Sequence, residues 1–192
     1  IVLSNPMDLC VFAELIIENK QPQIFNLRKQ QLEVINDDFL ALYGHSFPLT
    51  EFAEFTFEKR KLDKVFFSRN ELAEYLNCEI TEVLSRHKLL IRYHDKLQEQ
   101  TSDNIFYRFR HEKIMDFFSI YAFLGEHSNR QTEYLSDPRF RGIYFLLADT
   151  LPLNDAILLR DELNVYAAEN KDHSLSDEFL LKLRSRSKTS TF

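Results

Sequence analysis

The residues that could carry chemistry in this chain are few, and they form no recognised catalytic pattern. The 192 residues include only 3 Gly, and neither the G-x-x-x-x-G-K-[ST] nor the G-x-G-x-x-G phosphate-binding spacing occurs. His111-Glu112 begins like the zinc-protease helix H-E-x-x-H, but Met115 occupies the position of the second histidine. We therefore expect neither a phosphate-binding loop nor a zinc-protease site in these residues.

Metal binding and catalysis have little support elsewhere in the sequence. Cys10 and Cys78 are isolated, and neither belongs to a C-x-x-C pair, so we expect no metal site and interpret both as reduced thiols of a cytoplasmic protein. Catalytic triads are defined by geometry, and no G-x-S-x-G nucleophile turn occurs. We predict that this chain is not an enzyme; a hydrolase with a cryptic triad stays an alternative for an activity screen.

Composition narrows the range of partners. The formal net charge is −6 with 44% hydrophobic and 28% charged residues, so the chain lacks the basic surface that provides most non-specific affinity for nucleic acid. No apolar run approaches the roughly 18 residues of a membrane-spanning helix, and no signal peptide is visible. We expect no membrane contact. The chain begins at Ile1 without an initiator Met, and we expect it to be a fragment of a longer protein.

The hydrophobic spacing predicts a mainly α fold that starts with a helical domain over residues 1–59. Polar residues followed by Pro6 are typical of a helix start. A second helix is expected over 26–43 and ends at Gly44, and Thr50 can cap a third helix. We interpret the acidic pair Asp37-Asp38 and the mixed-charge run 58–64 as solvated helix faces.

The pattern over residues 60–124 predicts a winged-helix-like domain. Ser68 and Glu71 match a capping box, and Asn77 can cap the next helix. The helices expected at 69–76 and 79–87 form a helix-turn-helix. Alternation of apolar and polar residues predicts a small β-hairpin whose turn covers Gln98 to Asn104. The predicted strands cover 89–97 and 105–111, and a helix follows to Leu124.

The remaining residues, 125–192, are predicted to form a C-terminal helical segment. Its helices are expected at 139–149, 153–169 and 176–186.

A helix-turn-helix with a hairpin ordinarily suggests DNA binding, but the charges of the predicted recognition helix are poorly suited to contact with DNA. Its N-terminal half carries Glu79 and Glu82, which would face phosphates, while Arg86, His87 and Lys88 follow. The predicted hairpin carries Arg92, Arg108 and Arg110. A winged-helix DNA-binding transcriptional regulator is therefore kept as the alternative, and a helix-turn-helix used for protein packing is favoured.

One stretch resembles a known family. Phe106-Tyr-Arg-Phe-Arg-His111-Glu-Lys-Ile-Met-Asp-Phe-Phe-Ser-Ile-Tyr-Ala-Phe-Leu124 is similar to the segment that closes the winged-helix domain of NACHT-type signalling ATPases of the STAND class. Asn5-Pro6-Met7-Asp8-Leu9 looks like the proline-containing start of the small helical domain of that class, about a hundred residues upstream. The resemblance covers residues 1 to about 124.

The resemblance implies roles for two residues of this chain. Pro6 would contact the adenine, and His111 would approach the β-phosphate of bound ADP and hold the off state. The phosphate loop and the magnesium-binding acid are missing, so they would lie upstream of Ile1. The chain itself would hold no cofactor, ADP or ATP would bind to the full-length parent, and the partner would be the upstream nucleotide-binding domain or another protein. The resemblance thus predicts a regulatory and interaction fragment that gates the nucleotide state.

Overall fold

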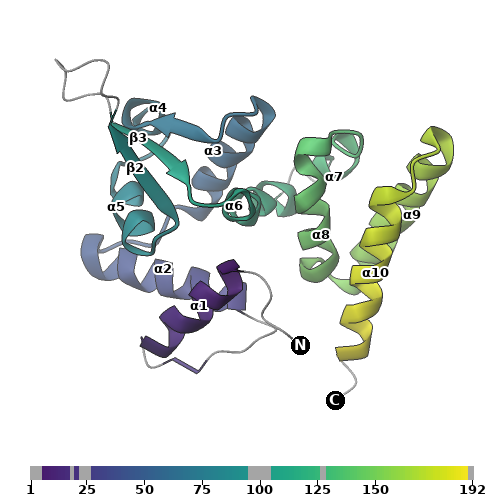
Figure 1. Ribbon diagram of the computed structural model, residues 1–192, viewed down its shortest axis with the longest axis horizontal. Coiled ribbons are helices and arrows are strands. Elements are labelled where there is room, and N and C mark those ends of the chain that lie inside the picture. Colours follow the sequence, from purple (N-terminus) through teal and green to yellow (C-terminus); the bar gives the residue numbers. More distant parts are fainter. Residues whose placement is uncertain (1–5, 18–19, 22–26, 95–104, 126–128, 190–192) are drawn as a thin grey trace. The chain divides into compact units, whose positions relative to one another are not determined.

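The structure is a computed structural model that describes residues 6–17, 20–21, 27–94, 105–125 and 129–189. It is mainly helical, with 71% helix and a small three-stranded antiparallel sheet (Figure 1), which confirms the mainly α class. In the described residues, no helix is long and apolar enough to cross a membrane. The chain forms two compact units, Ile1–Leu49 with Phe66–Ile114 and Thr50–Val65 with Met115–Phe192. The domains expected at 1–59, 60–124 and 125–192 stay a prediction.

The first unit begins with two helices packed on each other, α1 (Pro6–Ile17) and α2 (Leu27–Tyr43). Leu15 of α1 is buried against Leu27 and Val34 of α2, because these apolar side chains recur at helical spacing on the facing stripes. Gly44 ends α2 with a φ of +78°, a left-handed conformation that glycine adopts without steric cost. The helix predicted over 26–43 is confirmed.

The helix-turn-helix pair consists of α4 (Arg69–Ala73) and α5 (Glu79–Arg86). The capping box is present: Ser68 Oγ accepts from Glu71 N at 3.0 Å, and Glu71 Oε2 accepts from Ser68 N at 2.7 Å. The second cap differs from the prediction, because Cys78 occupies the N-cap of α5 without a side-chain bond. The Asn77 side chain still accepts from Glu79 N at 3.3 Å.

The sheet has the strand order β1-β3-β2, with β1 (Phe66–Ser68) and β2 (Leu90–His94) both antiparallel to β3 (Ile105–Phe109). Strand β1 was not predicted, because three residues are too few to display a two-residue period. Strand β2 begins one residue after the predicted start at 89, and the predicted end of that strand, 95–97, lies outside the described residues; β3 is two residues shorter than the strand predicted over 105–111. The predicted turn from Gln98 to Asn104 lies outside the described residues.

The alternation along β3 separates a buried face from an exposed one. Tyr107 and Phe109 are buried and Arg108 is exposed, as the sequence pattern predicts. The rings of Tyr107 and Phe109 both lie 5.9 Å from the ring of Phe67 in β1. These three aromatic side chains therefore fix the inner face of the sheet in the first unit.

The second unit consists of helices around an aromatic core. Its elements are α3 (Leu49–Lys61), α6 (Glu112–Leu124), α7 (Arg130–Glu133), the 3₁₀ turn η1 (Pro138–Phe140), α8 (Arg141–Thr150), α9 (Leu153–Asn170) and α10 (Ser174–Thr189). Helix α10 packs against α8 and α9, and the last three predicted helices are confirmed. Because α3 starts at Leu49, the prediction that Thr50 caps it is wrong, and α7 was not predicted.

A close approach in the second unit restricts what can stand at Gly142 of α8. A Cβ atom added there would collide with Oδ2 of Asp116 in α6 and would lie 3.0 Å from Asp116 Cγ. The carboxylate is buried and paired with Arg60, with 3.3 Å between Asp116 Oδ1 and Arg60 NH2. The Asp116 carboxylate therefore has little freedom to move away. Helices α6 and α8 can approach each other here only because residue 142 is glycine.

We predict that Gly142→Ala destabilises the protein by about 1–3 kcal/mol, the usual cost of overpacking a tightly filled site. Gly125→Ala is the matched control, because a Cβ there meets only Tyr121 O at an ordinary 3.7 Å. Urea unfolding of both variants checks the prediction. Equal stability of the two variants would show that Asp116 can retreat.

Candidate functional site

The first predicted site residue, His111, lies immediately before α6 and caps it. Its Nδ1 accepts a hydrogen bond from Lys113 N at 3.1 Å, which satisfies one of the backbone donors left unpaired at a helix start. A ring that accepts at Nδ1 carries its proton on Nε2 when neutral. Since His111 is exposed, its ring can offer an N–H donor at the junction of β3 and α6.

The second predicted site residue, Pro6, is the first residue of α1. This agrees with the predicted helix start, since proline fits the first turn without losing a needed hydrogen bond. The Pro6 side chain lies outside what the structure describes. The described hydrogen bond of the His111 ring comes from Lys113, two residues along the chain. This bond therefore does not connect His111 with α1.

The polar side of α5, the predicted recognition helix, faces α2 and the residues that follow α2. Tyr43 Oη donates to Glu82 Oε2 at 3.0 Å, and Arg86 NH1 lies 3.5 Å from Asp38 Oδ1. His45 Nε2 lies 3.5 Å from Glu79 Oε2. Burial and the hydrogen bond to Glu82 raise the pKa of Tyr43, so this hydroxyl stays protonated and donates. Glu79, Glu82 and Arg86, which were expected to face DNA, therefore have polar partners within the unit, and Lys88 is exposed.

Asp38 is the centre of this contact, which no pattern in the sequence predicts. His87 is only 8% exposed, and its Nε2 lies 3.4 Å from Asp38 Oδ2. Asp37 is exposed, as expected, and Lys20 Nζ bonds it at 2.9 Å. The interpretation of the acidic pair as a solvated face is therefore wrong for Asp38, because helix geometry turns adjacent residues in different directions.

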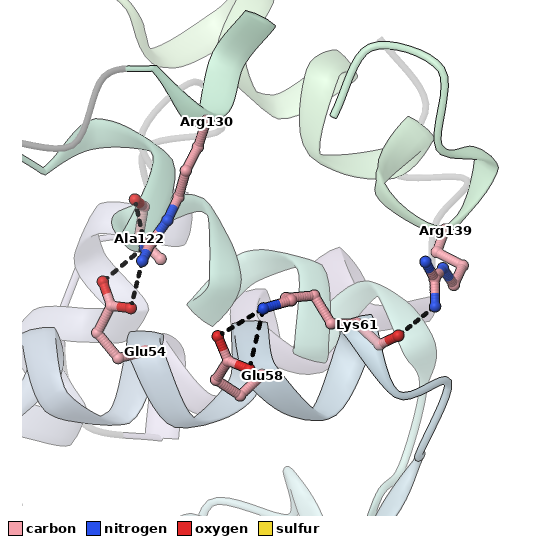
Figure 2. Close-up of polar contacts among 6 residues, drawn as sticks. All are labelled: Glu54, Glu58, Lys61, Ala122, Arg130 and Arg139. Carbon is pink, nitrogen blue, oxygen red and sulfur yellow. Dashed lines mark hydrogen bonds and ion pairs between the residues drawn. The ribbon is translucent and has the colours of Figure 1, made fainter. Parts of the chain in front are cut away.

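In the second unit, Arg130 forms a bidentate ion pair with Glu54 of α3 (Figure 2). Its NH1 and NH2 donate to the two carboxylate oxygens at 2.7 and 2.8 Å, and NH1 also donates to Ala122 O at 3.0 Å. The guanidinium carbon lies 4.2 Å from the Phe57 ring centroid. The hydrogen bond to Glu54 raises the pKa of Arg130. This bidentate geometry fixes the direction of both side chains.

The end of α3 is held by a second set of contacts, to the segment around η1. Arg60 is 8% exposed, and its Nε donates to Arg139 O at 2.7 Å. Arg139 NH1 in turn donates to Lys61 O (Figure 2), and the Arg139 side chain lowers the pKa of Asp137 through a hydrogen bond. The run 58–64, expected to be a solvated face, thus contains buried Lys59 and Arg60.

These contacts join helices and turns within the second unit. Among the residues that the structure describes, no group of three or more His, Cys, Asp or Glu side chains could hold a metal ion. Comparison with protein-family models, with curated proteins and with solved structures finds no match. The candidate site is the strand-to-helix junction at His111, where the exposed ring accepts from Lys113 N.

We predict that His111→Ala destabilises the protein by about 1 kcal/mol, because the alanine variant loses the cap of α6. His111→Ser is expected to be close to neutral, since a serine hydroxyl can accept from the same backbone donor. Thermal unfolding followed by circular dichroism checks both variants. If the serine variant lost as much stability as the alanine variant, capping would not be the role of the ring.

We also predict that Glu54→Gln costs about 1–2 kcal/mol, because a charge-assisted bidentate pair is lost while Arg130 stays in place. The matched control is Glu58→Gln, which removes an exposed pair with Lys61 at 3.1 Å (Figure 2). Exposed pairs of this kind contribute less than about 0.5 kcal/mol. Urea midpoints at low and high salt separate the two, and a larger loss for Glu58→Gln would contradict the assignment.

Proposed function

We propose that the chain is the helical and winged-helix region of a NACHT-type signalling NTPase of the STAND class, a regulatory and interaction region without catalysis of its own. The observation that carries the proposal is the position of His111, an exposed ring where β3 passes into α6, whose Nδ1 accepts from Lys113 N and leaves Nε2 as the donor of the neutral ring. In the resemblance described above, this is the residue that approaches the β-phosphate of ADP.

The order of elements supports the winged-helix part of the proposal. A helix, a short strand, two helices and a hairpin follow one another as α3, β1, α4, α5, β2 and β3, and β1 joins the sheet beside β3. A winged helix has this succession, with a helix-turn-helix before the hairpin. Helix α1 starts at Pro6 and precedes it, in agreement with the helical domain that the resemblance implies.

The mechanism that we propose is a gate held by one hydrogen bond. With ADP in an upstream nucleotide-binding domain, the His111 Nε2–H donates to the β-phosphate and keeps the winged helix against that domain. Since Nδ1 is held by Lys113 N, the donor direction is fixed before the nucleotide binds. Loss of the phosphate contact releases the winged helix, a change of domain position that signalling proteins commonly use.

Duplex DNA binding is the less favoured alternative. The exposed hairpin residues Arg92 and Arg108 could contact phosphates. However, the contacts of Glu82 and Arg86 with α2 occupy the polar side of α5, and a reading helix must present that side to the major groove.

The proposal predicts that, in the longer protein with its upstream sequence, His111→Ala and His111→Ser each weaken ADP retention on the order of tenfold or more, the usual effect of losing a hydrogen bond to a charged group. Stopped-flow release of a fluorescent ADP analogue measures this. His111→Ser is the informative variant, because it keeps the cap of α6 but cannot reach the phosphate. Release at the unsubstituted rate from the serine variant, or an upstream sequence without a phosphate loop, would refute the proposal.

A further inference from the structure

One face of the three-stranded sheet carries aromatic rings around an arginine. The register pairs Arg108 of β3 with Phe66 of β1 and with Ile91 of β2, and it pairs Phe106 with Tyr93. Cross-strand partners share a face of the sheet. These five side chains, which we call the outer face, therefore lie opposite the buried rings of the inner face.

The outer face is open at its two edges. Phe66 is 57% exposed and Tyr93 is 40% exposed, an unusual position for large rings in a chain whose other aromatic residues mostly fill cores. Arg108 is exposed between them, and its guanidinium carbon lies 5.5 Å from the Tyr93 ring centroid. The arginine therefore stacks on one ring and keeps its donors toward solvent.

The charge of this face differs from that of the whole protein. Arg108 gives the outer face a positive charge, and the described strand residues contain no Asp or Glu, whereas the chain has a net charge of −6. Arg92 pairs with Tyr107 and therefore belongs to the other face of the sheet. The outer face therefore repels cations and attracts anions locally. Its rings add a second requirement, because they favour a partner with flat, exposed π-surfaces.

We propose that the outer face binds single-stranded nucleic acid, with unpaired bases stacked on Phe66 and Tyr93 and a phosphate held by Arg108. Exposed aromatic residues on an antiparallel sheet are a common platform for unstacked bases, and stacking tolerates any base. Phe66 and Tyr93 stand on the two outer strands, about 10 Å apart across the sheet, which leaves room for the backbone between them. Duplex DNA keeps its bases stacked on each other and cannot use these rings.

This inference is independent of the nucleotide gate and has its own signature. Because a single arginine contacts phosphate, the salt dependence is shallow, with affinity falling less than about fivefold between about 50 and 200 mM salt. A nucleic-acid site built from many lysines and arginines loses far more over that range. Shallow dependence therefore separates stacking on the rings from general electrostatic attraction.

Fluorescence anisotropy with labelled 15-residue oligouridylate and oligothymidylate tests the proposal. Phe66→Ala and Tyr93→Ala are each expected to weaken binding on the order of tenfold, and Arg108→Ala is expected to weaken it as well. Tyr75→Ala is the matched control, because Tyr75 is 62% exposed but lies between α4 and α5 rather than on the sheet. An abasic oligonucleotide of the same length is expected not to bind.

A second readout guards against variants that fold poorly. The chain contains no Trp, so Tyr93→Trp places a single indole on the outer face, and stacking of a base on it is expected to quench its fluorescence. No binding to either oligonucleotide at low salt overturns the proposal. Equal binding of the abasic strand, equal loss in Tyr75→Ala, or tighter binding of duplex DNA overturns it too.

Discussion

The two-residue alternation of β3 is the constraint on which the first unit depends. This strand pairs with both of its neighbours, so its register decides which side chains of all three strands are buried. A slip by one residue would turn Arg108 to the inner face beside Phe67 and would expose Tyr107 and Phe109, a cost that fixes the pairing strongly. Because β1 runs directly into the capping box of α4, the same register also positions the helix-turn-helix.

The second unit is built from helices around a largely aromatic core, and the hydrophobic effect that buries these rings is non-directional. The rings of Phe57, Phe123, Tyr134 and Phe140 lie within 4.8–6.2 Å of one another, and such rings can pack in several ways. Polar contacts, whose geometry is directional, fix how the elements of this unit pack against one another. Arg60 contacts both Asp116 and the backbone carbonyl of Arg139. Removing one partner of this buried ion pair would cost more stability than the pair contributes, because the other charge would be left buried without a partner.

The two units thus place their charged groups with different consequences for function. In the first, charged residues of α5 contact α2, while His111 at the junction and Phe66, Tyr93 and Arg108 of the outer face are exposed. In the second, Lys59 of α3 is buried, Arg60 is paired with Asp116 and Lys61 with Glu58. The interactions proposed above therefore use the first unit, where donors and rings face solvent.

The sequence by itself determined the elements whose signals are local. Helix α2 with Gly44, the capping box at Ser68 and the alternation in β3 could all be predicted, because each depends on spacing within a few residues. It also predicted His111 as the last residue before α6, where the structure places it, whereas its role toward a nucleotide stays a prediction.

Only the tertiary structure decided which charged residues are solvated. Asp38 and Arg60 lie in runs that look like solvent-facing helix surface, yet both meet partners far along the chain: Asp38 contacts Arg86 and His87, and Arg60 contacts Asp116. Strand β1 likewise exists because β3 supplies its hydrogen-bonding partner. Local spacing determines where an element can form, but burial depends on which distant element packs against it, and that information is absent from any short window of sequence.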